Sequence, residues 1–339
     1  MAKMIHEFHV VAGPAIRAIL DEAPQRSIEC IRAAYLAHHD GQTINPDSYF
    51  LRFPSKPQNR IIALPASIEA GIDVSGIKWI ASFPENIKAG LARASATLIL
   101  NDSATGYPFA CMEGSHISAV RTAASAVLAA RALNADRRIA SDIAFVGAGI
   151  IAKNILEMFC EDGWAFEQIY VHDLDSHSAQ ALRDYAERRS DTAAFIEDDL
   201  NRALRRKIVV LATTASTPYV VPPIEFEAGQ IILNVSLRDI APELLLNAMN
   251  IVDDVDHCLK ANTSPHLAEM KFGHRDFISG TIAQLLRGEI AVDSSRPLIF
   301  SPFGLGVLDL ALGKLVFDEA HSRNMTTLIS DFFHDIARW

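Results

Sequence analysis

Two glycines near the middle of the chain have the spacing that lets a backbone hold a dinucleotide. An apolar run ending at Val146 leads into Gly147-Ala148-Gly149 and then into a helical pattern. A glycine at 147 permits a tight turn, one at 149 lets the backbone approach a pyrophosphate, and Ala152 is small enough for the helix to pack closely on the strand. The phosphates would lie at the N-terminus of that helix.

Asp173 ends the next apolar run, about twenty residues beyond the glycines, where a carboxylate accepts hydrogen bonds from the adenosine ribose. No Arg or Lys stands in the next several positions, where a 2′-phosphate would need a cation, and this favours NAD over NADP. Two glycines also occur at turns for steric reasons alone, but the surrounding pattern favours a cofactor site. The residues expected to contact the cofactor are Thr122, Gly147, Gly149, Ile150, Ile151, Asp173, Thr213, Thr214 and Ser236.

Several cations stand among small or apolar neighbours before the glycines, where they could bind an anionic substrate. Because an isolated buried cation is costly, Lys78 needs a carboxylate from the protein or from a substrate, unless it lies on the outward face of a strand. The guanidinium of Arg121, at a helix start beside Thr122, is suited to grip a carboxylate with two hydrogen bonds. The expected substrate-binding residues are Arg52, Arg60, Lys78, Arg93 and Arg121.

Asp239 follows the apolar run 231–235, at the end of a predicted strand. In an open α/β sheet, ligands bind at the carboxyl ends of the strands, so this carboxylate could exchange protons with an amine substrate. Capping a helix that begins near Pro242 is an equally good interpretation. Thr213 and Thr214 end the run 208–212 at an equivalent edge and could reach the dinucleotide.

Other catalytic signatures are missing from the sequence. It contains no G-x-S-x-G, no H-E-x-x-H and no phosphate-binding G-x-x-x-x-G-K motif. None of the 12 histidines has metal-ligand spacing. We therefore expect hydride transfer without a metal, with Asp239 or Lys78 as the catalytic residue that moves protons.

The elements that carry these residues fall into two patterns. From residue 139 onward, apolar runs alternate with helical stretches, which predicts a parallel sheet covered by helices. Before it, a helix at 26–39, strand-like runs and turn signals predict a mixed α+β domain that ends in a helix at 117–133. We expect an α/β protein with a Rossmann dinucleotide-binding domain at 123–307. Residues 1–122 with 308–339 would form the first domain, which binds the substrate.

Composition bounds the class of protein. The chain has 339 residues, of which 50% are hydrophobic, enough for about two domains. Its 4 cysteines lie far apart with no C-x-x-C pair, so reduced thiols are expected. The N-terminus lacks the apolar segment of a signal peptide or membrane helix, and the net charge is −10. We expect a cytoplasmic protein that binds neither membranes nor nucleic acid.

Four motifs together resemble the ornithine cyclodeaminase and mu-crystallin family over nearly the whole chain: Ser75-Gly-Ile-Lys78, Arg121-Thr-Ala-Ala124, Gly147-Ala-Gly149 and the segment 234–239. The resemblance implies that Lys78 and Arg121 hold the substrate carboxylate and that Asp239 is the acid/base group. It also implies NAD as cofactor and a homodimer formed by the first domain.

Within that family, the stretches 60–65, 74–80, 93–95 and 98–102 look most like the dehydrogenases that make 2,3-diaminopropionate. This resemblance implies oxidation of N-(1-amino-1-carboxy-2-ethyl)-glutamate to 2-oxoglutarate and 2,3-diaminopropionate, for siderophores or peptide antibiotics. Cyclodeaminases of the family carry a glutamate three residues before a proline, where Ile62 precedes Pro65 here. A cyclodeaminase, another amino-acid or imine oxidoreductase, and a non-catalytic NAD-binding protein of the crystallin type stay as alternatives.

Overall fold

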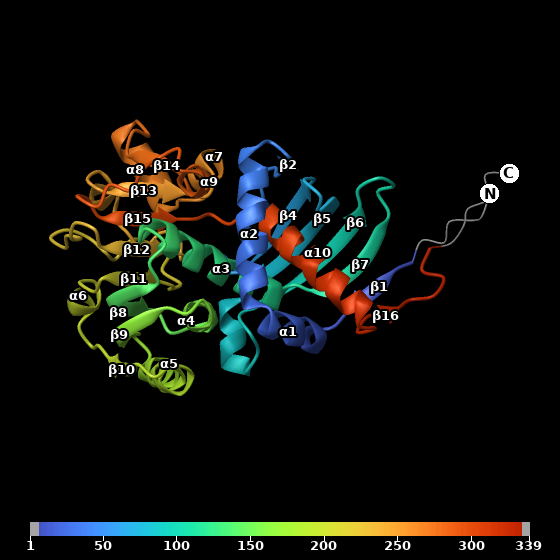
Figure 1. Ribbon diagram of the computed structural model, residues 1–339, viewed down its shortest axis with the longest axis horizontal. Coiled ribbons are helices and arrows are strands. Elements are labelled where there is room, and N and C mark those ends of the chain that lie inside the picture. The colour runs from blue at the N-terminus through green and yellow to red at the C-terminus, as the bar shows by residue number, and fades with distance from the viewer. Residues whose placement is uncertain (1–6, 334–339) are drawn as a thin grey trace. The chain divides into compact units, whose positions relative to one another are not determined.

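The computed structural model describes residues 7–333, and the chain divides into two compact units. The first unit consists of residues 1–121 and 305–339, and the second of residues 122–304. Figure 1 shows the elements of both along the chain. No helix of the described residues is long and apolar enough to cross a membrane.

The first unit is a mixed sheet covered by helices. Its strands run in the order β16-β1-β7-β6-β5-β4-β2, with β3 also pairing with β4. Helix α10 packs on β4, β5 and β6, and α2 packs on α10. The elements are β1 (His9–Val11), α1 (Gly13–Glu22), α2 (Pro24–His39), β2 (Thr43–Ile44), β3 (Tyr49–Arg52), β4 (Arg60–Ile68), β5 (Val74–Ser82), η1 (Pro84–Ala89), β6 (Ala94–Asp102), β7 (Pro108–Glu113), α10 (Gly306–Ser322) and β16 (Thr327–Leu328).

Helix α3 (Ser115–Leu133) begins in the first unit and ends in the second. It is rich in alanine, and most of its residues from Ile117 onward are buried. A helix buried on most of its surface needs apolar residues all round rather than on one stripe. The sequence-based helix at 117–133 is confirmed.

The second unit is a parallel sheet in the order β10-β9-β8-β11-β12-β15-β13-β14. The chain order reverses between β8 and β11, and such a reversal is where open α/β sheets bind ligands. The elements are β8 (Ile139–Val146), α4 (Ile150–Glu161), β9 (Ala165–His172), α5 (Ser176–Arg189), β10 (Ala193–Ile196), α6 (Leu200–Ala203), β11 (Ile208–Leu211), β12 (Ile231–Asn234), η2 (Pro242–Leu245), β13 (Met249–Val252), α7 (Val255–Cys258), α8 (Ser264–Phe272), β14 (Ile278–Thr281), α9 (Ile282–Arg287) and β15 (Leu298–Ser301).

These two sheets confirm the expected fold class, a Rossmann unit joined to a mixed α+β unit. Strand β8 is buried over its last four residues, and α4 buries Ile155, Leu156 and Phe159. Residues of β11 and β12 are buried throughout, as a parallel sheet covered on both faces requires. The buried sheet therefore fixes the carboxyl ends of β8, β11 and β12, from which the expected cofactor and acid/base residues extend.

Candidate functional site

The turn after β8 demands a glycine at position 147. Gly147 has φ +93°, and a Cβ there would lie 2.5 Å from the carbonyl oxygen of Ala212, just beyond β11. Both the left-handed backbone and this close approach exclude other residues. Gly147 thus lets the ends of β8 and β11 meet.

Gly149 differs, because nothing within the protein requires it. It is the N-cap of α4 with φ −82°, and a Cβ there would meet no atom within 4 Å. The open space lies beside the unpaired N–H groups of the first turn of α4, whose dipole favours an anion. Ala152 is fully buried, so the helix also packs closely on the sheet. These features fit the pyrophosphate of a dinucleotide.

Replacing Gly149 by serine is expected to weaken dinucleotide binding without weakening the fold. Serine is a good N-cap, but its side chain occupies the open space, so binding should lose about 1–3 kcal/mol. The measurement is NAD⁺ affinity by calorimetry beside thermal unfolding. Gly147→Ala is the contrasting variant, and it should destabilise folding by about 2–4 kcal/mol. Unchanged affinity in Gly149→Ser would contradict the phosphate site.

Asp173, which directly follows β9, stabilises the glycine turn by a hydrogen bond. Its Oδ2 accepts a hydrogen bond from the backbone N–H of Ala148 at 2.6 Å, and its Oδ1 accepts one from Asp175 at 2.8 Å. The carboxylate is partly exposed. Each oxygen keeps lone-pair capacity for a diol such as a ribose. The expected role of Asp173 is therefore compatible with its position.

The remaining expected cofactor residues lie on three elements. Ile150 and Ile151 form the first turn of α4, with Ile150 62% exposed. Thr214 is exposed just beyond β11, and Thr122 is half-buried on α3. Thr213 and Ser236 enter a hydrogen-bonded cluster with another expected site residue, which is Asp239.

Asp239 lies in the loop after β12 and is fully buried. Its Oδ2 accepts hydrogen bonds from Thr213 Oγ1 at 2.9 Å, from the Tyr219 hydroxyl at 3.0 Å and from Ser236 Oγ at 2.5 Å. Its Oδ1 has no partner in the described part of the chain. The N-cap of η2 is Ala241, so the interpretation of Asp239 as a helix cap is wrong.

Burial and hydrogen bonding act on the pKa of this carboxylate in opposite directions. Burial raises the pKa of Asp239, and the hydrogen bonds from Ser236, Thr213 and Tyr219 act against that rise. Burial, followed by the charge of Asp239, raises the pKa of Tyr219 far above its usual range, so this hydroxyl stays protonated. A carboxylate with a raised pKa and a bare oxygen suits general acid/base chemistry.

Lys78 points into the first unit, with only 2% of its surface exposed. Its Nζ donates to Asp309 Oδ2 at 2.5 Å and to Ser118 Oγ at 3.2 Å, while Arg121 Nε donates to Asp309 Oδ1 at 3.3 Å. The placement of Lys78 on an outward face is therefore wrong. The carboxylate that Lys78 requires comes from the protein, on α10.

The three charged groups shift one another's pKa. Burial lowers the pKa of Lys78 to about 8, against the attraction of Asp309. Burial also acts to raise the pKa of Asp309, but the charges of Arg121 and Lys78 outweigh it and hold that pKa below its usual range. Asp309 is thus a carboxylate at neutral pH. Within the described chain Arg121 bonds it only through Nε, which leaves the two η nitrogens for a ligand.

Strand register brings the other three expected arginines to one end of the same sheet. Arg52 pairs directly with Arg60, and Arg60 with Ser82, whose Oγ accepts a hydrogen bond from Arg93 Nη1 at 3.0 Å. Opposed residues of antiparallel strands share a face, and Ser82 shares the face of Lys78, four residues or roughly 13 Å away along β5. We call Arg52, Arg60 and Arg93 the arginine row. Arg52 is exposed and Arg93 is half-buried, and guanidinium groups gathered at one end of a sheet are suited to bind carboxylates.

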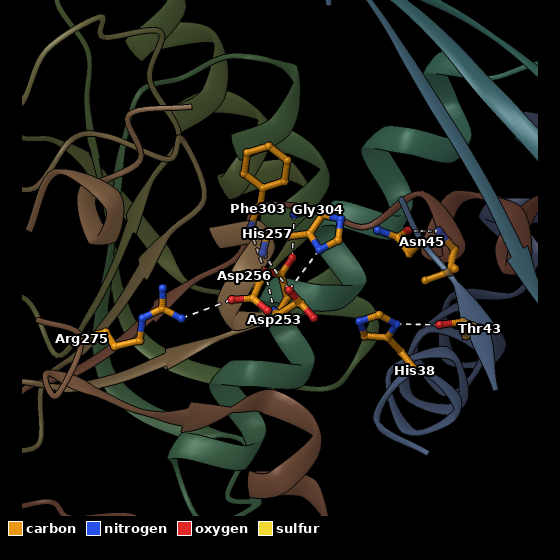
Figure 2. A network of polar contacts seen from close by, with 11 residues as sticks. His38, Thr43, Asn45, Asp253, Asp256, His257, Arg275, Phe303 and Gly304 are labelled. Carbon is orange, nitrogen blue, oxygen red and sulfur yellow. Dashed lines mark hydrogen bonds and ion pairs between the residues drawn. The ribbon is translucent and has the colours of Figure 1, made fainter. Parts of the chain in front are cut away.

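Helix α10 is held in place at its start. The N–H of Val307 donates to Asn45 Oδ1 at 3.2 Å, and Figure 2 shows Asn45 from close by. In the second unit, the buried carboxylate of Asp253 accepts hydrogen bonds from Phe303 at 2.9 Å and Gly304 at 2.6 Å (Figure 2). Within the first unit, the bond to Asn45 holds the start of α10, the helix that carries Asp309.

Sequence reasoning missed Asp309, Ser118, Ser82 and Tyr219. Asp309 had a usable signal, because it is a lone acid among Val307, Leu308 and Leu310 in an apolar helix and must find a cation. Hydroxyl residues such as Tyr219 carry no comparable signal. Their role depends on which side chain the fold brings to them.

Comparison with known proteins gives consistent matches. Residues 22–324 match the sequence model of the ornithine cyclodeaminase/mu-crystallin family. N-((2S)-2-amino-2-carboxyethyl)-L-glutamate dehydrogenase of Staphylococcus aureus is 29% identical, over 89% of this chain and 92% of its own.

Solved structures share the fold. Δ(1)-pyrroline-2-carboxylate reductase of Thermococcus litoralis, solved with NADH and L-proline, matches with a TM-score of 0.87 at 22% identity, over 95% of this chain and 100% of its own. An archaeal alanine dehydrogenase dimer with bound NAD matches with a TM-score of 0.84 at 23% identity, over 96% of this chain and 100% of its own. With the family's sequence model covering most of its length, the chain belongs to the ornithine cyclodeaminase/mu-crystallin family.

Proposed function

We propose that the chain is an NAD-dependent oxidoreductase that oxidises the C–N bond of an amino acid carrying several carboxylates. The substrate is N-(1-amino-1-carboxy-2-ethyl)-L-glutamate, and the products are 2-oxoglutarate and 2,3-diaminopropionate. The observation that carries the proposal is the arginine row, which lies on the same sheet face as Lys78. Among the described residues, no carboxylate contacts Arg93, which donates to Ser82. The S. aureus relative acts on the same type of compound by its name.

A substrate with three carboxylates explains the number of cations. Asp309 already neutralises part of the charge of Lys78 and Arg121, and the remaining η nitrogens of Arg121 suit one carboxylate. The arginine row would bind the other two. A monocarboxylate such as proline or alanine would leave the half-buried guanidinium of Arg93, which contacts the neutral hydroxyl of Ser82, without a carboxylate among the described residues, and this is costly.

The reaction needs a base for water and an acid for the departing amine. A bound NAD⁺ would supply the acceptor for the hydride that leaves the glutamyl Cα. Asp239 takes a proton from the water that adds to the resulting substrate iminium, and returns it to the nitrogen as the C–N bond breaks. The balance is substrate, NAD⁺ and water in, and 2-oxoglutarate, 2,3-diaminopropionate, NADH and one proton out.

The direct test is incubation of the purified protein with NAD⁺ and the aminocarboxyethyl-glutamate. We expect NADH and 2-oxoglutarate to form in equal amounts. A cyclodeaminase would convert ornithine to proline without net NADH, and a reductase would consume NADH with Δ(1)-pyrroline-2-carboxylate. A crystallin-type binding protein would do none of these. Formation of proline, or no turnover of any of these substrates, would overturn the proposal.

Replacing Arg93 by alanine is expected to lower kcat/KM for the tricarboxylate by about 10- to 100-fold, because a charge-assisted hydrogen bond contributes roughly 1.5–3 kcal/mol. Its partner Ser82 stays in place, so the fold should survive. Arg17→Ala is the matched control, since that side chain is 65% exposed and pairs only with Asp21. Equal kcat/KM in the Arg93 variant and wild type would remove Arg93 from the substrate site.

We also propose a homodimer. Tyr49 and Trp79 lie on either side of Ala63 on the sheet face opposite Lys78, and are 71% and 44% exposed. Adjacent exposed aromatic side chains are typical of an interface. Sedimentation should give twice the chain mass, and Trp79→Glu should lower the dimer fraction.

A further inference from the structure

We infer that the hydroxyl groups of Thr213, Tyr219 and Ser236 are positioning groups that hold Oδ2 of Asp239, so that Oδ1 is the atom that takes up and returns the proton. The inference rests on the proposed function, because it specifies how Asp239 would serve that reaction. Tyr219 is the informative member, since no cofactor or substrate role was expected of it.

The hydrogen-bond geometry divides the two carboxylate oxygens. All three hydroxyl contacts reach Oδ2, at 2.5–3.0 Å. Oδ1 is equally buried but has no partner among the described residues. A buried acceptor without a partner is costly. A ligand that donates to Oδ1 would remove that cost.

The direction of the hydroxyl hydrogens favours a proton on Oδ1. Thr213 Oγ1 already accepts the N–H of Ala215 at 3.2 Å, so its own hydrogen goes to Asp239. The Tyr219 hydroxyl also contacts Thr213, stays protonated, and donates to Oδ2. Ser236 Oγ has a second acceptor, the carbonyl of Leu211 at 3.0 Å. The hydroxyl donors thus converge on Oδ2 and none of them reaches Oδ1, so the acid proton is left with Oδ1.

The loop that carries Asp239 contains a strained backbone conformation. Leu237, two residues before Asp239, has φ +79°, a left-handed conformation that bulky residues rarely adopt. Its carbonyl is held by the N–H of Ser264 at 2.7 Å. Strain of this kind persists only where the surroundings over-determine it, and it concentrates at functional loops. The charged group beside the carboxylate is Arg238, which favours its ionised form.

The test is infrared spectroscopy of the free protein against pH, with the Asp239→Asn spectrum subtracted to isolate one carboxyl group. A carboxyl C=O that accepts hydrogen bonds absorbs at a lower wavenumber than one that accepts none. With the proton on Oδ1, Oδ2 is the carbonyl, and Tyr219→Phe removes one of its bonds. The band of the neutral acid should move to higher wavenumber.

Tyr219→Phe should also raise the pH midpoint of that band by about one unit, because a hydrogen bond to the charged form is lost. The acid limb of kcat/KM against pH should move by the same amount, since the base is the ionised form. Tyr170→Phe is the matched control, because that hydroxyl donates to Gln168 on the same sheet and not to Asp239. If Tyr219→Phe folds poorly, Ser236→Ala gives the same readout.

The outcomes of these measurements decide between the positioning role and the proposed function separately. An unmoved band and midpoint in Tyr219→Phe, or an equal shift in Tyr170→Phe, overturns the positioning role. A shifted band in a protein that turns over none of the amino-acid substrates supports the positioning role and overturns the proposed function. Turnover of the tricarboxylate with an unmoved band supports the proposed function and overturns the positioning role.

Discussion

Asp309→Asn is expected to destabilise the chain by about 3–5 kcal/mol, because it leaves the buried ammonium of Lys78 and the guanidinium of Arg121 without their shared carboxylate. The measurement is the free energy of unfolding in denaturant. Asp309 is fully buried with a lowered pKa, so its contribution is complete above about pH 4 and is lost as the pH falls through that lower value. The difference between variant and wild type should therefore shrink in acid.

A second acid on the same helix gives the control. Asp318 pairs with Lys314 at 2.6 Å, but its side chain is 57% exposed, so Asp318→Asn should leave the free energy of unfolding nearly unchanged. The double variant Lys78→Met with Asp309→Asn should recover part of the loss, since it removes the unpaired ammonium. Equal stability of Asp309→Asn and wild type would show that the two cations find water or another partner.

Asp239→Asn is expected to lower kcat by roughly 10²- to 10⁴-fold, the usual contribution of a general acid/base group. Asparagine keeps the shape and one acceptor oxygen for the hydroxyls of Thr213, Tyr219 and Ser236, so the loop should keep its conformation. The measurements are kcat with the tricarboxylate and NAD⁺ affinity, and the affinity should change little.

Asp293→Asn is the matched control for that variant, because Asp293 is an exposed acid of the same unit that pairs with Arg296. Its kcat should equal that of wild type. An Asp239→Asn enzyme within a few-fold of wild type would assign proton transfer elsewhere, and Lys78, with a pKa of about 8, would be the next candidate.

Local patterns in the sequence were enough to predict the cofactor turn. The glycine spacing, the apolar run before it and Asp173 after it all belong to one strand-turn-helix-strand segment, and short-range sterics decide its shape. The alternation of strands and helices likewise predicted the parallel sheet. Strands β14 and β15 were missed, although β15 lies inside that sheet between β12 and β13, because its four residues follow a stretch rich in turn residues.

The anion site could be predicted only in part. The sequence singled out the cations, but the arginine row depends on the register between β3, β4 and β5, which no local pattern states. The partner of Lys78 lies 231 residues further along the chain. The local sequence around each of the two residues does not identify the other as its partner. The ion pair between Lys78 and Asp309 could therefore be found only from the fold.

The distance along the chain between Lys78 and Asp309 has a consequence for how the protein is made. During synthesis the ribosome releases residues 122–304, which form a whole unit, before α10 exists. Until then the ammonium of Lys78 lacks its carboxylate partner Asp309, and burying an unpaired ammonium in the nascent chain is costly. We therefore expect the first unit to complete its folding only after α10, which carries Asp309, has been synthesised.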